Sequence, residues 1–148
     1  MDKLHATLIF FLIIGLLSSF LGYIDYLSQG NFCGYVAGST GVFSCETVYS
    51  IDEAMIVDGI HLSEIAPVFF IMAVMVYGLY FVFERRVFFV TLTLLLAIGS
   101  AMVPYLVYLE VSVAKAFCLF CTIMHVSIIG SFTLSSYIIF RARAMGPL

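Results

Sequence analysis

The sequence predicts an all-α membrane protein, a single domain over residues 1–148 that forms a four-helix transmembrane bundle. Hydrophobic residues make up 64% of the chain and charged residues 10%, and the mean hydropathy is +1.18. A composition so far from the soluble average indicates that most of the surface faces lipid. Four long apolar stretches follow one another along the chain, so the lipid bilayer is the first partner that we predict.

The charge and the cysteine content of the chain exclude two classes of protein. With six Lys and Arg and a formal net charge of −3, the chain has no basic patch that could neutralise phosphates, so we expect no nucleic-acid partner. Four cysteines are too few for a disulfide-dense secreted scaffold, but they gather in two places and suggest two pairs.

The first predicted span covers residues 4–24 and contains no ionisable side chain beyond His5 and Tyr23. At about 1.5 Å per residue, it is long enough to cross a bilayer as one helix. A cleaved signal peptide is the alternative, but its apolar region would be only about 7–15 residues long. Ser18, Ser19 and Phe20 also make a poor cleavage site.

One large loop outside the membrane, residues 25–64, is predicted between the first two helices, because six of the nine acidic residues fall there. Residues 45–56 predict a short interfacial helix with Ser44 as N-cap. Cys33 and Cys45 lie 12 positions apart, and glycines between them permit the tight path of a bridging disulfide. A purely structural loop disulfide is the alternative.

The other three predicted spans cover residues 65–83, 87–109 and 116–140. Pro67 is tolerated in the first turn of the second span, where its missing N–H would have no partner. Pro104 predicts a kink near the end of the third span. Residues 110–115 are predicted to form a short turn before the fourth span.

The fourth span opens with two thiols and an imidazole. In a helix, Cys118 and Cys121 lie on one face, close enough to oxidise to a disulfide, and His125 follows one turn after Cys121. Thiols in a first helical turn face the positive end of the helix dipole, which favours the reactive thiolate. Half a zinc site is the alternative, but no second Cys-x-x-Cys exists and the histidines are scattered, so we expect no metal.

Lys and Arg near the ends of the spans predict the orientation, because these residues resist translocation whereas acids count little. Only Lys115 lies on one side, against five on the other: Lys3, Arg85, Arg86, Arg141 and Arg143. We therefore predict a multi-pass protein of the cell membrane with both termini cytoplasmic. The cysteine loop and the Cys118 end of the fourth span are predicted to be extracytoplasmic, where disulfides persist.

This pattern resembles the vitamin K epoxide reductase family, in particular its prokaryotic disulfide-forming members, over essentially the whole chain. The resemblance rests on four spans, a cysteine pair in the first outer loop, and Cys118-Leu-Phe-Cys121-Thr-Ile-Met-His125 opening the last helix. Residues 59–63 also resemble a Gly-Ile-Pro-x-Ser element of the family, with His61 in place of Pro. The DsbB-type quinone reductases resemble this arrangement too, but they carry their Cys-x-x-Cys after the first helix. Here the motif opens the fourth helix, which favours the first family.

The resemblance implies a membrane thiol:quinone oxidoreductase that generates disulfides. Cys33 and Cys45 would form the shuttle disulfide that oxidises a thioredoxin-fold partner. Cys118 would accept electrons from Cys45, and Cys121 would face a membrane quinone of the ubiquinone or menaquinone type. A protein partner needs exposed sulfur, whereas a quinone is reached from within lipid.

Three departures from the family pattern argue against epoxide reduction. The loop spacing of 12 is longer than in the animal enzymes, Ile51 stands where many members carry Ser or Thr, and His125 replaces the Tyr of animal members. An ionisable residue inside a span is costly, so we predict that His125 bonds a quinone carbonyl or delivers a proton. The alternative is a neutral imidazole bonded to a carbonyl of a neighbouring helix.

Several other residues are interpreted without a catalytic role. His61 is expected to be polar surface. Aromatic runs and methionines in the spans are expected to pack or to face lipid: Phe69-Phe70, Tyr80-Phe81, Phe88-Phe89, Met72, Met75 and Met102.

Two rival functions come from other classes. The first is a tetraspan scaffold or adhesion protein with inert disulfides, which would resist mild reduction and would not depend on quinone. The second, a small transporter, is disfavoured because the predicted spans contain no carboxylate to couple ions.

Overall fold

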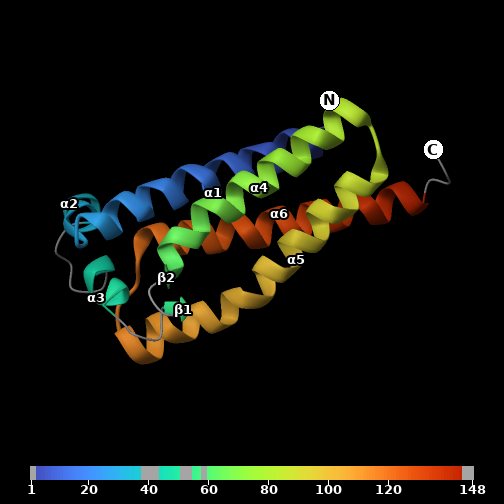
Figure 1. Cartoon of the computed structure of the whole chain (residues 1–148). Coiled ribbons are helices and arrows are strands. Elements are labelled where there is room, and N and C mark those ends of the chain that lie inside the picture. Colours follow the sequence, from blue (N-terminus) through green and yellow to red (C-terminus); the bar gives the residue numbers. More distant parts are fainter. Residues whose placement is uncertain (1–2, 38–43, 51–54, 58–59, 145–148) are drawn as a thin grey trace.

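The computed structural model describes residues 3–37, 44–50, 55–57 and 60–144, and four long helices dominate it (Figure 1). All four are long and apolar enough to cross a membrane. They are α1 (Lys3–Leu27), α4 (Leu62–Phe83), α5 (Arg86–Tyr108) and α6 (Leu119–Ala144). The predicted fold class, a four-helix membrane bundle, is confirmed.

Short elements fill the segment between α1 and α4: α2 (Asn31–Ala37), α3 (Cys45–Tyr49), β1 (Met55–Val57) and β2 (Ile60–His61), with the two strands antiparallel. Ser44 caps α3 as predicted, because its hydroxyl oxygen accepts the backbone N–H of Thr47. The prediction of one helix over residues 45–56 is wrong. The helix ends at Tyr49, and β1 gains strand hydrogen bonds by pairing with β2.

The predicted turn over residues 110–115 is also wrong. A π-helix, η2 (Leu109–Ala114), continues α5, and the chain reverses at Lys115, whose φ of 52° lies in the left-handed region. Continuing the helix buries Leu109, Glu110 and Ala114, which a solvated turn would leave exposed. As a result α6 begins at Leu119 and not at residue 116.

The bundle core is apolar and its outer surface is apolar too. Leu8, Leu12, Leu92 and Leu96 are buried between helices, while many large hydrophobic side chains of the spans remain exposed, as expected of a surface that faces lipid. Two helices pack closely at Gly15 of α1, where the ring of Phe70 from α4 occupies the space that a Cβ would need.

We expect Gly15→Ala to destabilise the bundle by about 1–3 kcal/mol, because the added methyl group overlaps the Phe70 ring. Gly78→Ala is the matched control, since a Cβ at Gly78 of α4 meets nothing within 4 Å. It should be neutral or slightly stabilising. Unfolding of the two variants in detergent compares them, and equal loss of stability would contradict this packing.

The cysteine-bearing elements gather at one end of the bundle. Figure 1 shows the start of α1, the end of α6 and the junction of α4 with α5 at the opposite end. Arg85 and Arg86 therefore share an end with Lys3, while Lys115 lies near the cysteines. This distribution has the asymmetry on which the orientation prediction depends.

Candidate active site

The two loop cysteines are joined in a disulfide between α2 and the first residue of α3. Cys33 and Cys45 have a Cα–Cα distance of 6.0 Å. Their side chains are 0% and 1% exposed. The expectation that this pair would present exposed sulfur is therefore not met in this conformation, because α3, the end of α1 and the start of α6 pack around it.

The second cysteine pair meets the first across the bundle end. The Sγ atoms of Cys45 and Cys118 lie 3.0 Å apart. Cys118 and Cys121 are both free thiols, the first buried and the second partly buried. A disulfide sulfur carries no hydrogen, so this contact places a nucleophilic sulfur directly against the bond that it could attack.

Backbone and side-chain hydrogen bonds fix this contact. The N–H of Ser44, beside Cys45, donates to the carbonyl of Phe117, beside Cys118, at 3.1 Å. On the other side, the hydroxyl of Ser18 in α1 donates to the carbonyl of Phe120 at 3.1 Å. The cap of α3 and the start of α6 are thus held together, although the two cysteines are far apart in sequence.

Cys118 lies immediately before α6. The sequence had suggested a position inside the first turn of that helix. The Cys118 sulfur accepts the backbone N–H of Cys121 at 3.5 Å, as an N-cap side chain does. Hydrogen bonds from the Cys121 thiol, the Cys121 N–H and the Tyr49 hydroxyl lower the pKa of Cys118, although burial and the nearby Glu110 oppose them. These hydrogen bonds favour the thiolate form of Cys118, which is the nucleophilic form of a thiol.

Tyr49 of α3 was not singled out from the sequence. Its hydroxyl lies 3.6 Å from the Cys118 sulfur and 3.2 Å from the carbonyl of Gly22. Burial raises the pKa of Tyr49, and the nearby cysteine thiols raise it further. The hydroxyl therefore keeps its proton at physiological pH. It can donate a hydrogen bond to the Gly22 carbonyl or to a Cys118 thiolate.

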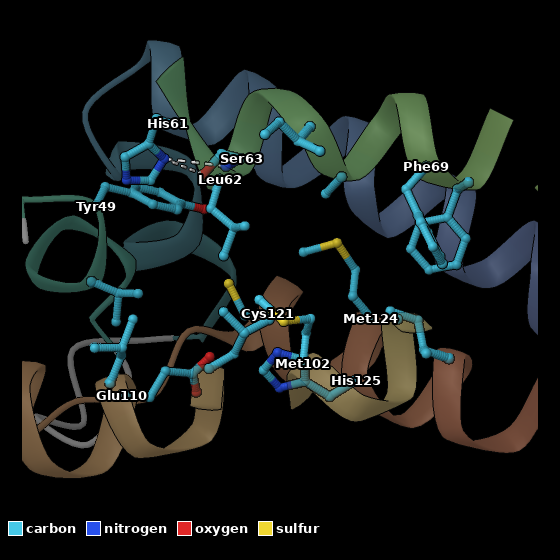
Figure 2. Close-up of a pocket in the computed structure, with 18 of the residues that line it drawn as sticks. Tyr49, His61, Leu62, Ser63, Phe69, Met102, Glu110, Cys121, Met124 and His125 are labelled. Atoms are coloured by element: carbon cyan, nitrogen blue, oxygen red, sulfur yellow. Dashed lines mark hydrogen bonds between the residues drawn. The ribbon is translucent and has the colours of Figure 1, made fainter. Parts of the chain in front are cut away.

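An apolar cavity of about 240 Å³ lies beside the thiols (Figure 2). Cys121 and His125 of α6 line it together with Glu110 of η2, and Figure 2 shows the three side chains turned toward a common space. Phe69, Phe70 and Met102 belong to the lining as well. The sequence had suggested only packing or lipid contact for these three residues.

His125 and Glu110 are buried ionisable groups of the cavity, as is His61. No described group forms a hydrogen bond with the His125 ring. The alternative interpretation, a neutral imidazole bonded to a carbonyl of a neighbouring helix, therefore finds no such carbonyl in the described structure. The backbone of Cys118 hydrogen-bonds to the Glu110 carboxyl group. Glu110 was not identified from the sequence as a site residue, because the sequence predicted a turn there. The apolar residues on both sides of Glu110 were a signal that the segment is buried.

The interpretation of His61 as polar surface is wrong. It is buried, stacks on Tyr26 with ring centroids 4.5 Å apart, and caps α4 by accepting the N–H of Ser63 at its Nδ1. That bond fixes the neutral tautomer with its proton on Nε2, and burial lowers the pKa of His61. Among the described residues Nε2 has no partner, and the residue lines the cavity.

The expectation that the spans contain no carboxylate is wrong. Glu110 lies in the helical continuation of α5, and Asp25 lies in the last turns of α1. A carboxylate oxygen of Asp25 and the sulfurs of Cys33 and Cys45 lie within 4.8 Å of one another. The two sulfurs are bonded to each other, so neither is a thiolate that a metal ion could take.

Comparison with known proteins identifies the family. A model of the vitamin K epoxide reductase family matches residues 6–136, a range that runs from α1 into α6 and includes all four cysteines and His125. No curated protein and no solved structure matches the chain. The chain belongs to the vitamin K epoxide reductase family.

Proposed function

We propose that this membrane thiol–disulfide oxidoreductase generates disulfides by passing electrons from a thioredoxin-fold partner to a membrane quinone. The route runs through Cys33 and Cys45 and then through Cys118 and Cys121. The observation that carries the proposal is the 3.0 Å contact between the sulfurs of Cys45 and Cys118, which joins the two pairs.

The redox state of the four cysteines fits the end of an internal transfer. Cys33 and Cys45 are bonded, and Cys118 and Cys121 are free. In the proposed sequence, a partner dithiol reduces the first pair, and Cys45 then attacks Cys118 in the oxidised second pair. When Cys33 closes onto Cys45, Cys118 and Cys121 hold the two electrons next to the cavity.

The cavity fits a quinone head group. Its lining is largely apolar, and its few polar groups are of the kind that bind and protonate carbonyl oxygens. A quinone supplies the acceptor for two electrons and two protons. His125 and Glu110 lie where they would deliver protons, and the fixed Nε2–H of His61 would donate a hydrogen bond.

Orientation is tested by labelling. After reduction, a thiol reagent that cannot cross membranes should label Cys33 or Cys45 from outside intact cells, and slowly, because both side chains are buried. Reversing the charges of Arg85, Arg86, Arg141 and Arg143 should weaken or invert this result, because these residues supply four of the five charges that predict the cytoplasmic side. Labelling from the cytoplasmic side alone would contradict the orientation.

Burial of the Cys33–Cys45 disulfide favours one second candidate, a tetraspan scaffold in which that bond is structural. Quinone reduction driven by a reduced thioredoxin-fold protein separates the two. The purified chain should reduce a short-chain ubiquinone or menaquinone analogue only when the reduced protein is present. A disulfide that survives mild dithiols, with no quinone consumed, would favour the scaffold.

A further inference from the structure

We infer that Asp25 is the proton acceptor for Cys33 in the step that closes the Cys33–Cys45 disulfide and releases Cys118. The inference rests on the relay proposed above and assigns a further catalytic residue to it. The sequence suggested no catalytic role for Asp25, which is one of the six acidic residues in the predicted loop of residues 25–64.

The Asp25 carboxyl group is held against the shuttle disulfide. Its Oδ1 accepts the backbone N–H of Cys33 at 2.8 Å. Its Oδ2 is buried and has no hydrogen-bond partner in the described part of the chain. The side chain is 0% exposed, and a carboxyl oxygen lies within 4.8 Å of both sulfurs.

This arrangement calls for an explanation, because a buried carboxyl oxygen without a donor is costly. No ion pair of Asp25 exists among the described residues, so a structural salt bridge does not account for it. While the disulfide is closed, Cys33 has no proton to give. When the bond is open, the Cys33 thiol gains a proton, and the neighbouring carboxyl group has in Oδ2 an acceptor that no other described group uses.

The step balances as a thiol–disulfide exchange. It begins from the mixed disulfide between Cys45 and Cys118, with Cys33 as a thiol. The Cys33 proton passes to the Asp25 carboxylate, and the Cys33 sulfur attacks Cys45. The bond from Cys45 to Cys118 breaks, and its electron pair leaves on the Cys118 sulfur.

The leaving thiolate is stabilised where it forms. The Cys121 N–H and the Tyr49 hydroxyl both reach the Cys118 sulfur. The products are a closed Cys33–Cys45 bond and free Cys118 and Cys121, which is the state that the structure holds.

Other titratable groups near Asp25 bear on how the step responds to pH. Besides the two disulfide cysteines on α2 and α3, Tyr49 of α3 and Cys121 of α6 interact with the carboxylate. Ahead of α4, His61 stacks on Tyr26, the residue next to Asp25. Tyr49 keeps its proton and burial favours neutral His61, so Asp25 is the base within reach of Cys33.

The test is a single turnover. Fully reduced chain is mixed with one equivalent of a short-chain quinone, quenched with acid at intervals, and mapped as non-reduced peptides. In the native chain the Cys45–Cys118 bridge should appear briefly and decay. In Asp25→Asn, which keeps an oxygen for the Cys33 N–H, its decay should slow roughly tenfold or more and recover as pH rises.

Two further variants separate chemistry from structure. Asp25→Glu keeps a proton acceptor and should restore much of the rate at neutral pH. Glu46→Gln removes the exposed carboxylate next to Cys45 and should leave bridge decay unchanged. A merely structural defect would lower turnover without accumulating the bridge.

Several outcomes would overturn the inference. Asp25→Asn with native bridge decay and a native pH profile would overturn it and leave the relay intact. If Asp25→Asn does not fold, the native chain decides, since bridge decay strictly proportional to hydroxide concentration would exclude an internal acceptor. If no bridge forms in the native chain at any time, the relay fails and this role fails with it.

Discussion

A Cys121→Ser chain is expected to accumulate a mixed disulfide between Cys45 and Cys118 and to lose quinone turnover by several orders of magnitude. Cys121 is the sulfur proposed to face the acceptor and to resolve that bridge from the Cys118 side, whereas Cys33 resolves it from the Cys45 side. Without Cys121, Cys118 stays bonded to the sulfur that lies 3.0 Å away in the native structure. Mass mapping of non-reduced peptides measures the bridge, and quinone absorbance measures turnover.

The other single substitutions serve as matched controls for this result. Cys118→Ser should prevent the bridge, because the accepting sulfur is gone. Cys33→Ser should impair transfer from the partner yet leave Cys45 able to attack the Cys118–Cys121 disulfide, since exchange requires only a thiolate and an accessible sulfur. A Cys121→Ser chain that shows only the Cys33–Cys45 bond and free Cys118 under all redox conditions would refute the relay.

His125→Ala is expected to lower quinone turnover about 10²-fold, as the loss of a positioned acid or hydrogen-bond donor does. Exchange of the Cys33–Cys45 pair with a partner dithiol should remain nearly intact. The reason is spatial, because His125 lines the cavity next to Cys121, whereas neither Cys33 nor Cys45 belongs to the lining. The two half-reactions are measured separately.

Ser127→Ala is the control for that experiment, since Ser127 is a buried polar residue on α6 that does not line the cavity. It should leave both half-reactions unchanged. Unchanged turnover of His125→Ala at saturating quinone, under conditions where quinone reduction limits the rate, would return His125 to a packing role.

Much of the fold could be read from hydropathy, because lipid requires every spanning backbone to satisfy its own hydrogen bonds within a helix. The second predicted span, residues 65–83, lies within α4, and Ser44 caps α3 as its side chain suggested. The errors fall where apolar content gives no guidance. The strand pairing of β1 with β2 and the continuation of α5 through η2 depend on partners elsewhere in the chain.

The bundle, the family and the two cysteine pairs could be predicted from local patterns, because long apolar runs and a Cys-x-x-Cys are local signals. Which polar residues turn inward depends on how the helices pack. Asp25, Tyr49, His61 and Glu110 lie in segments that looked like loop, interface or turn, yet three of them are buried and Tyr49 reaches the Cys118 sulfur. Burial of a polar side chain is decided by the distant helices that close over it and by the partners they bring, which no local pattern contains.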